Sequence, residues 1–208
     1  MSEYFEVNAD NPQKRAIDRA VALLRGGGVG AYPTDSCYAL GCCIGEKQAL
    51  DRIRALRRLD EKHHLTLICA DLSDISTWAK VDNIAFRLIK SLTPGPYTFL
   101  LPATRELPRR LRHPSRHTIG IRIPADNIAR ELVSALGEPL MSTSLILPEA
   151  GVPLSDPDDI RTELDHALDF ILAAGARSLE ETTVLDLDGH APVLVRQGLG
   201  DISGLGLD

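Results

Sequence analysis

Short apolar runs alternate with amphipathic helical stretches along most of the chain, and this alternation limits the fold more than any other feature. Apolar residues recur at helical spacing over residues 17–24, three glycines follow, and a short apolar run occupies residues 29–32. The same order returns with a helical face over residues 49–56 and an apolar run over residues 65–69. Helices interleaved with short buried strands are typical of a layered α/β domain with a mixed sheet.

The rest of the chain continues this alternation. A first helix is expected to open at Asn11-Pro12, and a later one to be capped by Asn83 with Ile84 on its inward face. The sequence also predicts helices over residues 127–136 and 156–168, and strands over residues 97–101, 118–123 and 139–144 and near Phe170, Val184 and Val193. Because it has no internal repeat and no long linker, we expect residues 1–208 to form one domain.

Composition argues against several classes of protein. Hydrophobic residues make up 44% of the chain and charged residues 25%, as in ordinary globular domains. No apolar run approaches the ~20 residues that span a bilayer, and the N-terminus lacks the features of a signal peptide, so we expect a cytoplasmic protein without a membrane partner. The four cysteines lie within residues 37–69, two of them adjacent, which favours reduced thiols. His63 and His64 lack the spacing of a zinc site, and we assign no metal ligand.

The net charge of -6 conceals a strongly basic segment. Residues 105–122 contain six arginines against a single acidic residue, Glu106. Such asymmetry indicates an anionic partner. One interpretation is that the segment binds the backbone of tRNA or another double-stranded RNA, and the candidate contacts are Arg109, Arg110, Arg112 and Arg116. The other interpretation is that the segment is a mobile surface lid.

The stretch YPTDSCYALG (residues 32–41) concentrates polar groups directly after a predicted strand. We interpret it as a strand-to-helix corner whose polar face lines a ligand site, with Cys37 pointing into the core. The alternative is that Cys37 is a catalytic nucleophile, although its neighbours carry no signature of a cysteine hydrolase. We assign no catalytic residue.

Hydroxyl residues and arginines recur at the predicted strand ends, where open α/β sheets form ligand sites. They are Thr34, Ser36, Thr98, Thr118, Arg122, Ser142, Thr143, Ser144, Thr182, Thr183 and Arg196. Arginine binds phosphate through its planar guanidinium group, so these residues together predict a polar, anion-binding cleft. The chain has neither the Walker A motif nor the G-x-G-x-x-G motif.

The stretch YPTDSCYALG resembles the P-T-[DE]-T-x-Y-G-L-G signature of the YrdC/YciO family of threonylcarbamoyl-AMP synthases. Five further segments resemble that family in the same order: PGPYTFLL (94–101), TIGIRIP (118–124), LMSTS (140–144), TTVLDL (182–187) and VLVRQG (193–198). The resemblance covers nearly the whole chain and is closest to the YciO branch of the family.

This resemblance implies a single YrdC-like α/β domain with a twisted open mixed sheet, helices on its faces and a large concave basic cavity. It also implies conversion of ATP, L-threonine and bicarbonate into threonylcarbamoyl-AMP and pyrophosphate, with Mg²⁺ accompanying ATP and the product serving tRNA modification. The residues expected to bind ATP and its phosphates are Arg57, Arg58, Ser142, Ser144 and Arg196. Those expected near threonine and its carbamate are Thr34, Tyr38, Thr118, Arg122 and Thr182.

Two motifs of the family are incomplete in this chain. The family sequence K-x-R-P aligns with residues 57–60 (RRLD), and S-[AP]-N aligns with residues 144–146 (SLI). Each charged hydrogen bond that is lost costs roughly 1.5 to 3 kcal/mol of binding free energy. We therefore expect a nucleotide-binding protein with weak or altered synthase activity. The alternative is a non-enzymatic RNA-binding module that uses the same basic cavity.

Overall fold

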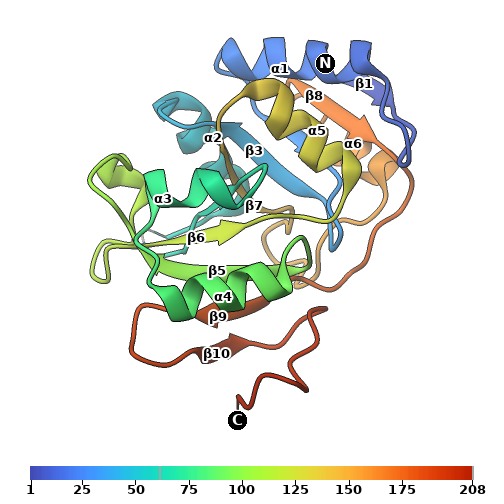
Figure 1. Ribbon diagram of the computed structural model, residues 1–208. Helices are drawn as coiled ribbons and strands as arrows, with labels where there is room; N and C mark the ends of the chain where they lie inside the picture. Colours follow the sequence, from blue (N-terminus) through green and yellow to red (C-terminus); the bar gives the residue numbers. More distant parts are fainter. Residues whose placement is uncertain (61, 208) are drawn as a thin grey trace.

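Ten strands form one mixed sheet in the computed structural model, which describes residues 1–60 and 62–207 (Figure 1). The strands are β1 (Glu3–Glu6), β2 (Gly30–Tyr32), β3 (Ala39–Cys43), β4 (Thr66–Ile68), β5 (Tyr97–Pro102), β6 (Thr118–Arg122), β7 (Leu140–Ser144), β8 (Phe170–Ala173), β9 (Thr183–Asp186) and β10 (Val193–Arg196). Their order across the sheet is β1-β8-β2-β3-β7-β4-β6-β5-β9-β10. Parallel and antiparallel pairs are interspersed, which confirms the predicted mixed sheet.

Helices connect the strands and pack on the sheet. They are α1 (Lys14–Arg25), α2 (Lys47–Arg57), α3 (Ile75–Trp78), α4 (Asn83–Leu92), α5 (Asn127–Leu136) and α6 (Pro157–Leu164). Short 3-10 turns occupy Leu72–Asp74 and Arg109–Leu111. Within the described residues, none of the helices has the length and apolar character needed to cross a bilayer.

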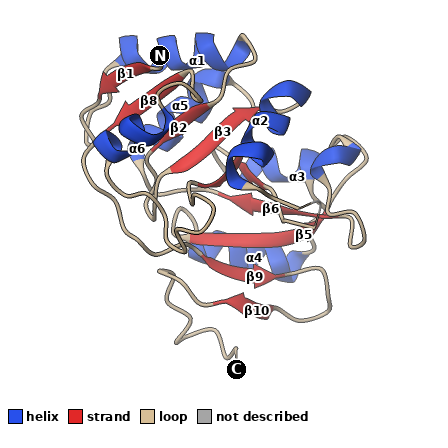
Figure 2. Cartoon of the chain, turned by 180° about the vertical axis from the view of Figure 1, so that it is seen from behind, coloured by secondary structure: helices blue, strands red, loops and turns tan. Residues whose placement is uncertain are grey.

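Two clusters of buried side chains form the core. The larger combines strand residues such as Leu67 with residues of α2, α3, α4 and α6, whereas the smaller combines Ile68 and Phe170 with residues of α1 and α5. Leu67 and Ile68 belong to different clusters because successive side chains of a strand point to opposite faces. Helices α1 and α5 lie together near β1 and β8 in Figure 1, and Figure 2 shows α2 and α6 on the opposite side.

Most of the predicted elements are present. Helix α5 has the predicted bounds, and strands β2 and β4 to β10 lie on the predicted apolar runs. Strand β1 and helix α3 were not predicted, because each has four residues and a segment of that length shows little periodicity.

The predicted start of the first helix was wrong. Helix α1 begins after Gln13 and not at Asn11-Pro12. The reason is that the side-chain oxygen of Asn8 accepts hydrogen bonds from the backbone N–H groups of Asp10 and Asn11, which holds that segment in a turn.

Two further helix boundaries differ from the predictions. Helix α4 is capped by Asp82, whose carboxylate accepts hydrogen bonds from the first turn, and not by Asn83. Ile84 therefore lies in the exposed first turn and is 63% exposed, not inward-facing. Helix α6 ends at Leu164 and does not continue to Leu168.

The YPTDSCYALG stretch contains the end of β2, a loop of residues 33–38 and the start of the antiparallel strand β3, so the predicted strand-to-helix corner was wrong. Strands β2 and β3 pair with Tyr32 opposite Ala39 and Gly30 opposite Gly41. All residues of β3 are buried. A strand buried on both faces has no alternation of polar and apolar residues, which is the pattern that would have identified it.

Strands β2 and β8 approach each other closely because Gly30 has no side chain. Gly30 lies opposite Phe170, which is fully buried in the smaller core cluster. A Cβ atom on Gly30 would overlap the Phe170 ring. Glycine at position 30 therefore lets the ring fill the space between the sheet and helices α1 and α5.

Replacing Gly30 with alanine should lower the free energy of unfolding by about 1 to 3 kcal/mol, because the added methyl group must displace the ring. Urea denaturation measures this loss. The double variant Gly30→Ala/Phe170→Leu should lose less than the sum of the two single variants, since leucine vacates the ring position. Strictly additive losses would contradict the proposed overlap.

Candidate functional site

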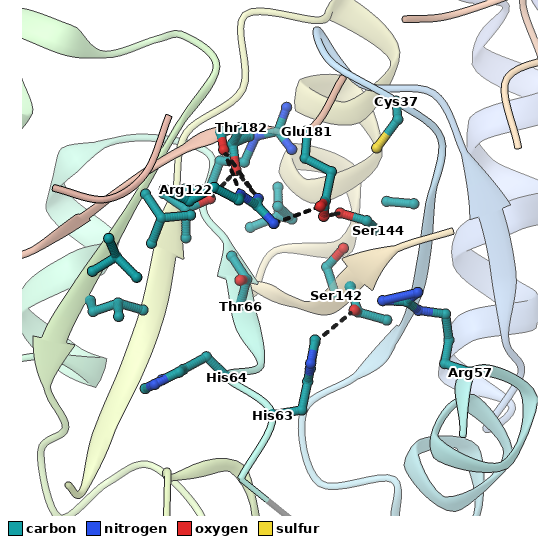
Figure 3. A pocket seen from close by; sticks show the side chains of 18 of the residues that line it. Cys37, Arg57, His63, His64, Thr66, Arg122, Ser142, Ser144, Glu181 and Thr182 are labelled. Atoms are coloured by element: carbon teal, nitrogen blue, oxygen red, sulfur yellow. Dashed lines mark hydrogen bonds and ion pairs between the residues drawn. The ribbon is translucent and has the colours of Figure 1, made fainter. Parts of the chain in front are cut away.

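A cavity of about 440 Å³ lies against the sheet, and its wall combines strand residues with the end of α2 and two loops (Figure 3). The lining residues are Cys37, Ala39, Arg57, Lys62, His63, His64, Thr66, Ile68, Thr98, Leu100, Arg122, Ser142, Thr143, Ser144, Glu181, Thr182, Val184, Val195 and Arg196. Four of them are basic side chains and one, Glu181, is a carboxylate. The lining is thus basic, as expected.

A buried ion pair joins the loop of residues 33–38 to strand β6. The Arg122 guanidinium group, whose side chain is 7% exposed, donates to the Asp35 carboxylate and to the hydroxyls of Thr34 and Ser36, the latter two at 3.1 Å. The second Asp35 oxygen accepts a hydrogen bond from the backbone N–H of Ala125 at 3.0 Å. The predicted residues Thr34 and Arg122 are therefore brought together, and the loop has a fixed shape beside the cavity.

The two incomplete family motifs meet in the structure. Arg57 Nη1 donates to the backbone carbonyl of Ile146 at 2.6 Å. Arg57 stands at the lysine position of K-x-R-P, and Ile146 stands at the asparagine position of S-[AP]-N. Leu59, at the arginine position, packs against the larger core cluster. Arg57 Nε is buried without a partner among the described residues, while the Arg57 side chain as a whole lines the cavity.

Arg196 binds the segment that precedes β9. Its Nη1 donates to the Glu181 carboxylate at 2.6 Å, and its Nε and Nη2 donate to the Thr182 carbonyl at 3.2 and 3.1 Å. The other Glu181 oxygen accepts a hydrogen bond from the Ser144 hydroxyl at 2.9 Å. The Thr182 hydroxyl lies 2.8 Å from that of Thr98. The predicted residues Ser144, Thr182 and Arg196 therefore lie together, with a carboxylate between them.

Two histidines line the cavity between α2 and β4. His63 Nε2 lies 3.3 Å from the Thr143 hydroxyl, and burial together with the nearby Arg57 guanidinium lowers the pKa of His63. His64 stacks on His113 with ring centroids 4.4 Å apart, and burial together with His113 lowers the pKa of His64 to about 4. Both imidazoles are therefore neutral at pH 7, and the stack attaches the arginine-rich segment to the edge of the cavity.

Three residues predicted to lie near threonine are buried outside the cavity lining. They are Thr34, Tyr38 and Thr118. The Tyr38 hydroxyl donates to the backbone carbonyl of Gly175 at 2.9 Å, so it serves the protein's own structure. Thr118 Oγ1 is buried with no partner in the described part of the chain.

Cys37 is a buried residue of the cavity wall, as Figure 3 shows. Burial raises the pKa of its thiol. Since the thiolate is the nucleophilic form, this environment does not favour the alternative of a cysteine nucleophile.

Other predicted cations are engaged within the protein. Arg58 lies on the surface outside the cavity lining and pairs with Glu149 at 3.0 Å. In the arginine-rich segment, Arg110 donates to the Gly45 carbonyl, Arg112 to the carbonyls of Arg105 and Leu107, and Arg116 to Asp186 and Asp188. Arg109 is exposed beside this group. These bonds use donors that RNA phosphates would need, and RNA binding by the segment stays a prediction.

Several lining residues were not predicted to bind a ligand, among them Lys62, His63, Thr66 and Glu181. Glu181 directly precedes the TTVLDL segment, and Lys62 and His63 closely follow the K-x-R-P position. Adjacency to a matched motif was therefore the available signal for three of these residues.

Comparison with known proteins places the chain in a family. Residues 22–198 match the model of the Sua5/YciO/YrdC family, described as "Telomere recombination". YciO of Escherichia coli, described as an uncharacterized protein, is 50% identical over 97% of this chain and 98% of its own length. A threonylcarbamoyl-AMP synthase of Chromobacterium violaceum is 41% identical over 64% of this chain and 69% of its own length.

Solved structures agree with the sequence comparison. The crystal structure of E. coli YciO matches with a TM-score of 0.95 and covers 98% of each chain. The crystal structure of P. abyssi Sua5 complexed with L-threonine matches with a TM-score of 0.87 at 25% identity, over 95% of this chain and 58% of that one. The motifs, the sheet and these matches together establish that the chain belongs to the Sua5/YciO/YrdC family.

Proposed function

We propose that the cavity binds ATP and L-threonine and that the protein has threonylcarbamoyl-AMP synthase-type activity, weak or altered relative to the family. With bicarbonate as third substrate, the products would be threonylcarbamoyl-AMP and pyrophosphate, linked to tRNA modification. The observation that carries the proposal is the convergence of Arg57, Arg122, Ser144 and Arg196 on one cavity. Two relatives support it: the synthase of C. violaceum and the L-threonine complex of Sua5.

The lining suits a reaction that depends on positioning and charge neutralisation. Bicarbonate supplies CO₂ and hydroxide, and the amine of threonine adds to the CO₂ and loses a proton to the hydroxide, which gives a carbamate and water. A carbamate oxygen then bonds to the α-phosphorus of ATP, and pyrophosphate leaves as the α–β phosphoanhydride bond breaks. Arg57 and Arg196 would neutralise phosphate charge, and Arg122 would face the threonine carbamate. Because the carbamate is the nucleophile, the reaction needs no activated protein side chain.

Mg²⁺ would enter with ATP. Among the described residues, no group of three or more His, Cys, Asp or Glu side chains is arranged to hold a metal ion. Mg²⁺ at nucleotide sites is usually bound by one or two carboxylates plus the phosphates, and the described lining offers one carboxylate, Glu181. When bound, the ion would neutralise part of the triphosphate charge.

The proposal predicts release of pyrophosphate that requires ATP, L-threonine and bicarbonate together. A coupled pyrophosphate assay measures it, with reactions that omit threonine or bicarbonate as controls. Incorporation of ¹⁴C-threonine into a nucleotide product would identify the adenylate. Pyrophosphate release no faster than with heat-denatured protein would rule out the enzymatic part of the proposal.

Replacing Arg57 with alanine should weaken ATP binding roughly ten- to hundred-fold, because one charged hydrogen bond to phosphate is lost. Arg58→Ala is a matched control, since Arg58 is the adjacent arginine but pairs with Glu149 on the surface. The Arg58→Ala variant should bind ATP with the affinity of the wild type. Isothermal titration calorimetry measures both, and an equal effect of the two substitutions would contradict the assignment of Arg57 to the nucleotide.

A further inference from the structure

We propose that Glu181 is an internal anion that occupies a phosphate position of the cavity and so limits which ligands enter. In the structure it holds the side chains that an incoming phosphate group would need. This inference rests on the anion-binding part of the proposed function and adds to it a residue that sets affinity and charge selectivity.

The Glu181 carboxylate binds two side chains that are expected to contact the nucleotide. One oxygen accepts a hydrogen bond from Arg196 Nη1 at 2.6 Å. The other accepts one from Ser144 Oγ at 2.9 Å, and Figure 3 shows Glu181 and Ser144 side by side. A guanidinium group binds carboxylate and phosphate oxygens with the same planar geometry. A phosphate group that uses the same two donors, Arg196 Nη1 and Ser144 Oγ, must therefore displace the carboxylate.

The backbone of residue 181 is fixed, whereas its side chain has room to move. The Glu181 carbonyl accepts a hydrogen bond from the backbone N–H of Leu199 at 3.1 Å, and Arg196 binds the Thr182 carbonyl. A Cβ atom on Gly198 would overlap the Glu181 carbonyl, so these segments lie in close contact. The side chains of Glu181 and Arg196 are 25% and 40% exposed. Rotation of the Glu181 side chain alone can thus free Arg196 while β9 and β10 stay in place.

The ion pair of Glu181 and Arg196 also reduces the positive charge that a ligand meets in the cavity. Asp35 neutralises Arg122, and Glu181 neutralises Arg196. An anion that approaches Arg196 is repelled by Glu181 until the carboxylate moves away. A polyvalent anion such as pyrophosphate would bind Arg57 and Arg196 together, and this attraction would exceed the repulsion from Glu181. An anion with one charge would be attracted to Arg196 no more strongly than the Glu181 carboxylate is. A divalent cation bound to the phosphates reduces the same repulsion.

Calorimetric titration with inorganic pyrophosphate, at fixed ionic strength and with EDTA to remove divalent cations, tests this inference. Glu181→Gln keeps the shape of the side chain and removes its charge, so it should bind pyrophosphate roughly three- to ten-fold more tightly than the wild type. Glu180→Gln makes the same change in net charge at an exposed neighbour and should bind like the wild type. With Mg²⁺ present, the gain of Glu181→Gln should shrink.

Two results of the titration would overturn the inference. Weaker binding by Glu181→Gln would mean that the carboxylate positions Arg196 for its ligand. An equal gain in Glu181→Gln and Glu180→Gln would mean that net charge alone explains the effect. Glu181→Ala, which can form neither hydrogen bond, should tighten binding in the same direction as Glu181→Gln, and urea unfolding verifies that each variant is folded.

Parallel titrations with ATP separate this inference from the proposed function. If Glu181→Gln tightens pyrophosphate binding while ATP fails to bind, the internal anion is supported and the nucleotide part of the proposed function is wrong. If neither pyrophosphate nor ATP binds any variant, the internal anion is ruled out as well.

Discussion

The buried ion pair between Arg122 and Asp35 is the interaction on which the cavity depends. In the sheet order, β7 and β4 lie between the β2–β3 pair and β6, so the loop of residues 33–38 must reach across two strands to meet Arg122. A buried guanidinium without acceptors is strongly unfavourable, and this loop supplies a carboxylate and two hydroxyls. The pair therefore fixes the loop and one side of the cavity at once.

The two family motifs that are incomplete in this chain are in contact through Arg57. Arg57 is longer than the family's lysine, and its guanidinium reaches the backbone carbonyl of Ile146, where the family has an amide side chain. Leu59 replaces a cation with an apolar side chain that adds to the core. The changes thus remove two polar side chains of the family motifs and connect α2 to the segment after β7. Under the proposed function, a nucleotide beside Arg57 would meet fewer donors but a more rigid wall.

Periodicity predicted the elements whose two faces differ, and it failed where local contacts or burial on both faces decided the structure. Helix α5 matches its predicted bounds because its apolar face repeats regularly, whereas β3 is buried on both faces and showed no alternation. For the site, strand ends and motifs located Ser144, Thr182 and Arg196. They did not indicate Glu181, because its bond to Arg196 arises from the pairing of β9 with β10. Nor did they show that Arg58, in a left-handed conformation after α2, points to the surface.

The order of the cavity residues along the chain has a consequence for biosynthesis. The lining begins at Cys37 and ends at Arg196, and the last wall is formed by the antiparallel pair β9–β10. On a ribosome, the loop that holds Arg122 and the end of α2 emerge long before Glu181 and Arg196. A nascent chain therefore presents its early arginines without the strand pair that completes the pocket. The proposed anion binding, with its full set of contacts, therefore requires that translation has passed β10.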